Sequence, residues 1–140
     1  MNKILDMYEP LIKTYPIHAN ITSILSTHKY FYEWLYNNHI QLFCTTYNSN
    51  GSQDTYLDTY KPLTRVFNPF FETQFIKKDI IFKSKIDICE FIINSIDLGY
   101  YIFLSIDVFF ISLYKKSEHS GHDIFVFGYD KNKKIFHVAD

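Results

Sequence analysis

The C-terminal stretch from His122 to Asp140 decides the fold that the sequence predicts. It reads HDIFVFGYD, then KNKK, then IFHVAD. Two apolar runs rich in β-branched and aromatic residues, joined by a short polar segment, are typical of a β-hairpin. A three-residue loop over 130–132, ending in an asparagine that tolerates the left-handed region, would close this hairpin. That loop would pair Gly128 with Lys134.

The same register pairs His122 with Asp140 at the open end of the hairpin. Directly opposed residues share a face of the sheet, with β-carbons about 5 Å apart. A carboxylate in that position fixes the tautomer of the imidazole and supports its positive charge. A slip of one residue would instead pair Asp123 with Asp140 and turn His122 to the other face. The alternative interpretation is that both are ordinary polar residues at a sheet edge.

Upstream of the hairpin, residues 100–106 form a nearly continuous apolar run, as expected of a strand covered on both faces. Asp107 interrupts this run, and residues 108–114 are expected to extend the sheet. The polar segment 115–121 is expected to be a loop.

The spacing predicts a helix over 85–98. Ser84 and Asp87 resemble a capping box at its start, and Gly99 suits its C-terminal cap. Apolar residues recur at helical spacing and predict a narrow buried seam made of Ile86, Cys89, Ile93 and Ile96.

The N-terminal part predicts a helix over 17–36, because its apolar residues form one stripe and Pro16 suits a helix start. A strand is expected over 39–47, followed by a loop over 48–62. Residues 63–84 are expected to be irregular, with one short helix or strand.

Together these elements predict an α+β fold in a single domain over 1–140. The first helix is expected to pack against an antiparallel sheet built from 39–47, 100–114 and the final hairpin. The second helix would cover another part of that sheet. Because the chain stops just after a strand, it is expected to be the N-terminal part of a longer protein, with the domain truncated at its C-terminus.

Composition excludes several classes of function. The formal net charge is −1, so no basic field points to nucleic acid. The first residues do not form a signal peptide, and no apolar run approaches the ~20 residues of a membrane span. The chain is therefore expected to be cytoplasmic, in a reducing compartment that suits two cysteines with neither a disulfide framework nor zinc spacing.

No cofactor is indicated, and a metal site is not expected. His119 and His122 are close in sequence, but they lack carboxylate or thiolate partners at useful spacing. Cys44 is expected within a strand and Cys89 within the apolar seam, where cysteine acts as a small buried hydrophobe.

The tail, with its histidine, apolar strand, Gly-Tyr-Asp, turn and final strand ending in Asp140, resembles the His–Asp half of papain-like, bacteriocin-processing-type cysteine peptidases. The segment from Gly99 to Asp107 is similar to the strand-to-Asp segment of the same group. The stretch HANITSIL from His18 resembles the first helix of the butirosin biosynthesis protein H N-terminal family. The resemblance covers roughly residues 15–140, with gaps, and implies a papain-like fold.

The resemblance implies a Cys-His-Asp triad that transfers acyl groups through a thioester, with His122 as base and acid and Asp140 orienting it. It implies substrate contacts from His18, Asn20 and Asp107. The substrate would be a peptide or an acyl chain tethered to a carrier protein, in bacterial peptide or aminoglycoside natural-product biosynthesis.

The sequence departs from the family where the nucleophile belongs. The first helix should begin with cysteine, but this chain has Tyr-Pro-Ile-His over 15–18, and none of these residues can form a thioester. Two functions stay open. One is a peptidase- or acyltransferase-like domain that has lost or replaced its nucleophile; the other is a binding module for a peptide or carrier protein, in which the cleft is vestigial.

Overall fold

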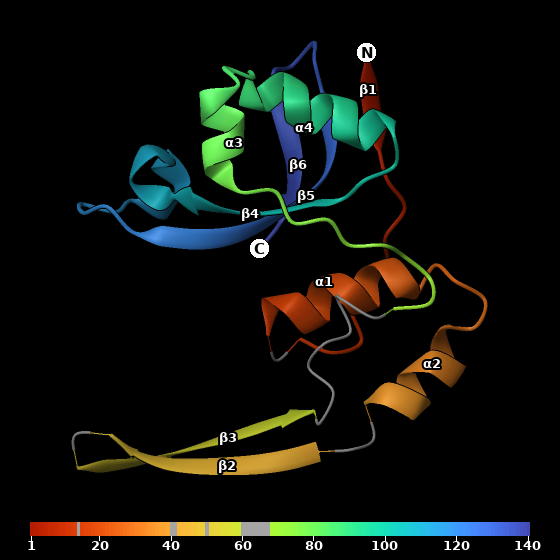
Figure 1. Cartoon of the computed structure of the whole chain (residues 1–140), viewed down its shortest axis with the longest axis vertical. Coiled ribbons are helices and arrows are strands. Elements are labelled where there is room, and N and C mark those ends of the chain that lie inside the picture. Colours follow the sequence, from red (N-terminus) through yellow and green to blue (C-terminus); the bar gives the residue numbers. More distant parts are fainter. Residues whose placement is uncertain (14, 40–41, 50, 60–67) are drawn as a thin grey trace.

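The structure is a computed structural model that describes residues 1–13, 15–39, 42–49, 51–59 and 68–140. It is a mixed α+β fold with antiparallel sheets, as the sequence predicts (Figure 1). Helices and strands follow in the order β1 Asn2–Ile4, α1 Pro16–Leu25, α2 Phe31–Asn38, β2 Leu42–Ser49, β3 Ser52–Thr59, α3 Lys78–Lys83, α4 Ile88–Asp97, β4 Ile102–Asp107, β5 Gly121–Asp130 and β6 Ile135–Ala139. None of the helices described could cross a membrane.

Strand β5 is the centre of the larger sheet, because β1, β4 and β6 all pair with β5 (Figure 1). One edge of β5 pairs with β4 over 121–126 and with β1 over 128–130. The other edge pairs with β6 over 125–130. All three pairings are antiparallel, so the predicted C-terminal hairpin and its partner strand are confirmed.

A β-bulge at Phe127 interrupts the pairing of β5 with β6. Val126 pairs with Val138, but the next paired residue, Gly128, meets His137. The extra residue reverses the alternation of side chains along β5. For that reason Val126 and Tyr129, three residues apart, both point into the core beneath α4.

Helix α4 covers the larger sheet (Figure 1). The Asp87 side chain caps its first turn by accepting a hydrogen bond from the Glu90 N–H at 3.0 Å. The residues it buries are Ile92, Ile93 and Ile96. Burying each such side chain contributes roughly 1.5–3 kcal/mol. At the end of the helix, Asp97 accepts a hydrogen bond from the Tyr129 hydroxyl at 2.7 Å, which fixes the helix over β5.

Several details of this region correct the sequence prediction. The buried seam of α4 begins at Ile92, whereas Ile86 and Cys89 are exposed because the first turn does not reach the core. Ser84 ends α3 and does not cap α4. The predicted cap after the helix is confirmed, since Gly99 adopts φ +92°.

Residues 108–114 do not extend the sheet as predicted. They form two 3₁₀ turns, over 108–110 and 112–114. The Asp107 side chain starts the first turn by accepting from the Phe109 N–H at 3.0 Å, which bends the chain out of β4.

The N-terminal part differs most from the prediction. The expected helix over 17–36 is divided into α1 and α2. At the division, Ser26 and Thr27 donate their hydroxyls to backbone carbonyls of α1, in competition with the helical ladder. The second segment then folds back, and one cluster buries Ile21, Leu25, Phe31, Trp34 and Leu35.

This cluster means that α1 packs against α2 and not against the larger sheet, contrary to the prediction. The expected strand at 39–47 is present as β2, but among the described residues it pairs only with β3, in a separate two-stranded sheet. The segment from Ser52 to Thr59 is therefore a strand and not part of a loop. Residues 48–49 of that predicted loop belong to β2, and residues 50 and 60–62, like 63–67, lie outside the described residues.

Gly128 gives a direct test of how closely β1, β5 and β6 approach one another. A β-carbon at this position would lie 2.8 Å from the Lys3 carbonyl oxygen and 3.1 Å from the Ile4 α-carbon. We expect Gly128→Ala to lower the free energy of unfolding by about 1–3 kcal/mol, because backbone must move to admit the methyl group. Urea denaturation measures this change.

Gly121→Ala is the matched control, since among the described residues its β-carbon would meet only the Ser105 hydroxyl, at 3.4 Å. We expect a change below about 0.5 kcal/mol there. Equal effects of the two substitutions would contradict the close approach at Gly128.

Candidate functional site

The predicted contact between His122 and Asp140 is present. Nε2 of His122, on β5, touches Oδ1 of Asp140, which follows β6. The other carboxylate oxygen, Oδ2, accepts a hydrogen bond from the Tyr114 hydroxyl. The Tyr114 ring also lies beside the imidazole, with ring centroids 5.2 Å apart. Three side chains from separate segments therefore form one cluster, which we call the His122 cluster.

The register that produces this contact differs from the predicted one. Residue Lys134, and not Asn132, adopts the left-handed conformation, with φ +56°. The turn therefore spans 131–134, and Gly128 pairs with His137, not Lys134. Counting on from the pair Phe125–Ala139 places Asp140 opposite residue 124. His122 is then its diagonal neighbour on the same face, within reach of a side-chain contact.

The hydrogen bonds of the cluster favour the ionised form of Asp140. Hydrogen bonds from Tyr114 and then from His122 hold the pKa of Asp140 below its ordinary value. The same contact raises the pKa of Tyr114, because its proton is held by a carboxylate. The side chains of His122 and Asp140 are 40% and 43% exposed, so solvent and ligands reach the pair.

The contact also determines which imidazole nitrogen is left for chemistry. An ionised carboxylate only accepts hydrogen bonds, so the nitrogen facing Asp140, Nε2 of His122, carries a proton. Nδ1 is then the nitrogen that could accept a proton from a reacting group. This geometry allows general-base chemistry, but it supplies no nucleophile.

A groove of about 680 Å³ lies between the larger sheet and α1. Asp123, Phe127, Val138 and Ala139 line it from the sheet. The wall across from them includes the first two turns of α1, with Pro16, Ala19 and Asn20. Residues 7–10, Lys13 and Ser23 also line it. Asp140 also lines the groove and so joins it to the His122 cluster.

The structure separates the three predicted substrate-binding residues. Asn20 lines the groove. His18 does not line it: its side chain is buried, with its ring between those of Tyr15 and His39 at 5.9 and 5.7 Å. Asp107 is not among the lining residues either.

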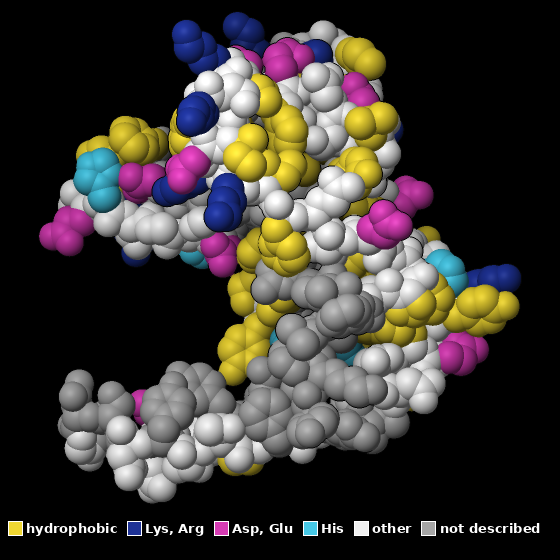
Figure 2. Space-filling model, in the orientation of Figure 1, with side chains coloured by type: hydrophobic (Ala, Val, Ile, Leu, Met, Phe, Trp, Pro, Cys, Tyr) yellow, Lys and Arg dark blue, Asp and Glu magenta, His cyan; other side chains and the backbone are white. Residues whose placement is uncertain are grey.

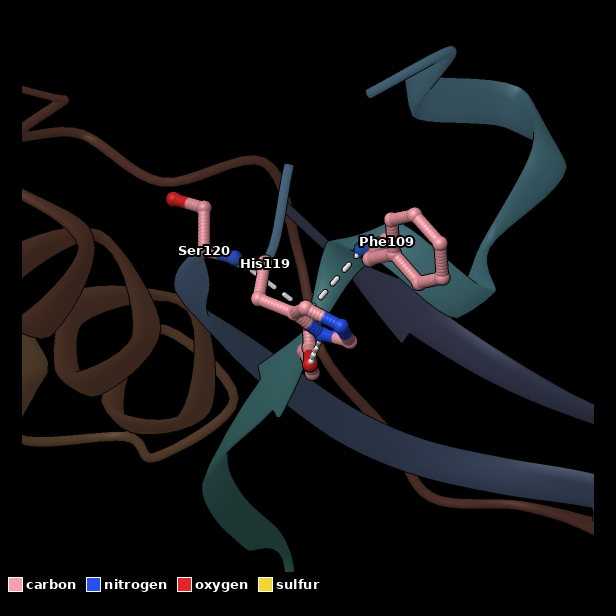
Figure 3. Close-up of polar contacts among 4 residues, drawn as sticks. Phe109, His119 and Ser120 are labelled. Atoms are coloured by element: carbon pink, nitrogen blue, oxygen red, sulfur yellow. Dashed lines mark hydrogen bonds and ion pairs between the residues drawn. The ribbon is translucent and has the colours of Figure 1, made fainter. Parts of the chain in front are cut away.

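Asp107 belongs to a second histidine–carboxylate pair. Its Oδ2 accepts from Nδ1 of His119 at 2.6 Å, and its Oδ1 accepts from the N–H groups of Phe109 and Ser120 at 3.0 and 3.2 Å (Figure 3). The His119 ring lies against that of Phe109, with centroids 4.3 Å apart. These bonds lower the pKa of Asp107, the His119 contact first, and they close the segment between β4 and β5. The Asp107–His119 pair therefore has a structural role: it holds the two ends of this segment together.

Neither cysteine lies near the His122 cluster. Cys44 is on β2, in the separate sheet. Cys89 is in the first turn of α4, where its neighbour Glu90 meets Lys131 at the turn of the hairpin, with 3.5 Å between Nζ and Oε2. About 25 Å of strand separates that turn from His122. Both thiols are exposed, so Cys89 is not the buried hydrophobe that the sequence predicted.

Tyr114 is the member of the cluster that the sequence did not reveal. It lies in an apolar run, Val108 to Tyr114, that reads as a strand. Only the 3₁₀ turns bring its hydroxyl to Asp140.

Among the described residues, no group of three or more histidine, cysteine, aspartate or glutamate side chains could hold a metal ion. The chain matches no known protein family, no curated protein and no solved structure.

The role of Tyr114 can be tested by titration. We expect Tyr114→Phe to raise the pKa of Asp140, because it removes the hydrogen bond that contributes most to favouring the ionised form. The lowered pKa stabilises the fold above the ordinary pKa of 3.8, and this stabilisation is lost as the pH falls through the folded-state value. Carbon-13 NMR of the carboxyl group across that range measures the shift.

Tyr32→Phe is the control, since Tyr32 is exposed on α2, where its ring lies beside those of Phe31 and Tyr36. It should leave the titration of Asp140 unchanged. An unchanged Asp140 titration in Tyr114→Phe as well would contradict the proposed hydrogen bond.

Proposed function

We propose that this chain is a domain related to papain-like cysteine peptidases and acyltransferases of bacterial peptide or aminoglycoside natural-product biosynthesis, that it acts in the cytoplasm, and that it has lost the nucleophile. It binds an extended peptide, or an acyl chain tethered to a carrier protein, in the groove between α1 and the sheet. The observation that carries the proposal is the His122–Asp140 contact at the rim of that groove.

The size and lining of the groove suit a small-molecule or peptide ligand. Its volume of about 680 Å³ falls within the range of small-molecule sites, about 300–1,000 Å³. Tyr8 and Phe127 supply apolar surface, and Asn20 supplies an amide on the α1 wall. Asp123 and Asp140 are acidic, while Glu9 and Lys13 bind each other. The groove therefore suits a partly apolar ligand with a free amine or hydrogen-bond donors.

The positions of the cysteines favour binding without covalent catalysis. A thioester requires a thiolate within contact of the reacting carbonyl group and of its base. Cys89 lies at the far end of the hairpin from His122, and Cys44 lies in the other sheet. A histidine–carboxylate pair can still deprotonate water or a substrate thiol at Nδ1 of His122, but such general-base help contributes only about 10²–10⁴-fold. The second candidate function is accordingly a purely binding module.

Blocking the groove tests the proposal. A fluorescein-labelled pantetheine thioester of a short peptide is a suitable probe, with binding followed by fluorescence anisotropy. Ala19→Trp places a large ring in the groove lining, so we expect it to weaken binding about tenfold or more. Ser117→Trp, in an exposed loop, adds the same ring outside the groove and should leave the affinity unchanged.

His122→Ala distinguishes the two candidate functions in the same assay. If the domain only binds, the probe affinity stays close to that of the wild type and no hydrolysis of the thioester is detected in either protein. If His122 acts as a base, the wild type hydrolyses the thioester and His122→Ala does not. Equal binding of the probe by Ala19→Trp and wild type would rule out the groove as the site.

A further inference from the structure

The outer edge of β6 is open in the part of the chain that the structure describes. Among the described residues, β6 pairs with β5 alone, and its opposite edge accepts no strand (Figure 1). Ile135 and Val138 are 44% and 46% exposed along it. Edge strands of monomeric proteins usually carry lysine, proline or another device that prevents pairing with a further strand. The sequence of β6, IFHVA, contains none of these residues.

The residues of this edge are complementary to themselves when read in the opposite direction. In an antiparallel pairing about a two-fold axis at His137, each residue faces the residue of the second copy that lies equally far on the other side of His137. This pairing places Ile135 opposite Ala139 and Phe136 opposite Val138, so apolar side chains meet on both faces. It also places Lys134 opposite Asp140 at each end, which joins opposite charges twice because a two-fold interface repeats every contact.

The other open edge of the same sheet lacks this property. Strand β4 reads IFLSID and pairs only with β5 among the described residues. An antiparallel pairing of β4 with itself about its centre would place Asp107 opposite Ile102, an unmatched carboxylate beside an apolar side chain. Self-pairing is therefore favoured at β6 and not at β4.

We propose that β6 pairs with β6 of a second copy of this chain, antiparallel and centred on His137, so that the larger sheet continues across a two-fold dimer. Pairing satisfies the outward backbone groups of β6 and covers Ile135 and Val138. The pairing brings Lys134 of the second copy beside Asp140, the carboxylate that links the His122 cluster to the groove. The partner copy thereby contributes a cation to the site.

Site-specific cross-linking tests the register. In a Cys44→Ser, Cys89→Ser background, a single cysteine is placed at residue 135, 137 or 139 and oxidised with copper phenanthroline. Directly opposed residues of antiparallel strands have α-carbons about 4.5–5.5 Å apart, within the range that a disulfide spans. We expect His137→Cys to form a covalent dimer on a non-reducing gel, because only this residue faces its own copy. Ile135→Cys and Ala139→Cys should cross-link when mixed, and each far less alone.

Charge reversal in the turn supplies an independent measurement that does not alter β6. Lys134→Glu turns two attractive contacts into repulsive ones, so we expect the dimer to dissociate about tenfold more readily in sedimentation equilibrium. Lys29→Glu is the control: it makes the same charge change at an exposed lysine between α1 and α2, outside the hairpin, and should leave the dimer unaffected.

A wild-type chain that stays monomeric at about 100 µM, well above the μM Kd expected even of a weak specific interface, would overturn the proposal. A dimer whose cross-linking at residue 137 does not exceed that at residue 135 alone would overturn the register, and so the contribution of Lys134 to the site. Both outcomes leave the groove-binding test above unaffected, because that test measures the probe affinity of Ala19→Trp.

Discussion

The β-bulge at Phe127 is the constraint on which the rest of the structure depends. Side chains alternate along a strand, so one additional residue in β5 exchanges the faces of everything beyond it. With the bulge, Val126 and Tyr129 both face α4 and share one core. The same bulge places His122 and Asp140 on one face at the other end of the hairpin. A regular ladder could give one of these arrangements but not both.

The sequence predicted the hairpin and the His122–Asp140 contact, although its register was wrong. The predicted register pairs Gly128 with Lys134, whereas the structure pairs it with His137, three residues further along the chain. The bulge at Phe127 reduces this shift by one residue. At the open end of the hairpin, the partner of each β5 residue is therefore displaced by two residues from the predicted one. An even displacement preserves the face of every side chain, and for that reason a contact predicted as directly opposed is found as a diagonal one.

Helix α4 and its end at Gly99 were predictable because helical spacing, a capping carboxylate and a left-handed glycine are local signals. The N-terminal half was not. The division between α1 and α2 depends on Phe31 folding back onto Ile21 and Leu25, a contact that apolar periodicity does not reveal. In the same way, Tyr114 reaches Asp140 only through the 3₁₀ turns after β4, in a segment whose composition favours a strand.

Two histidine–carboxylate pairs lie at the same end of the larger sheet and have different roles. The second oxygen of Asp107 accepts hydrogen bonds from backbone N–H groups, so its pair with His119 closes a loop. The second oxygen of Asp140 accepts from the Tyr114 hydroxyl, and Asp140 lines the groove, so its half-exposed pair with His122 is available to a ligand. Both aspartates pair with a histidine, so the pairing alone does not distinguish the two sites. What distinguishes the structural site from the candidate functional one is the group that binds the second carboxylate oxygen.

The tautomer of His122 is the most direct test of its contact with Asp140. Long-range proton–nitrogen NMR at neutral pH distinguishes the two tautomers of each histidine. We predict that neutral His122 carries its proton on Nε2, held by Asp140, more completely than free histidine, which already favours this tautomer. Asp140→Ala should return the tautomer ratio to that of free histidine. A wild-type His122 whose nitrogen shifts match those of free histidine, and do not respond to Asp140→Ala, would contradict the contact and the register that produces it.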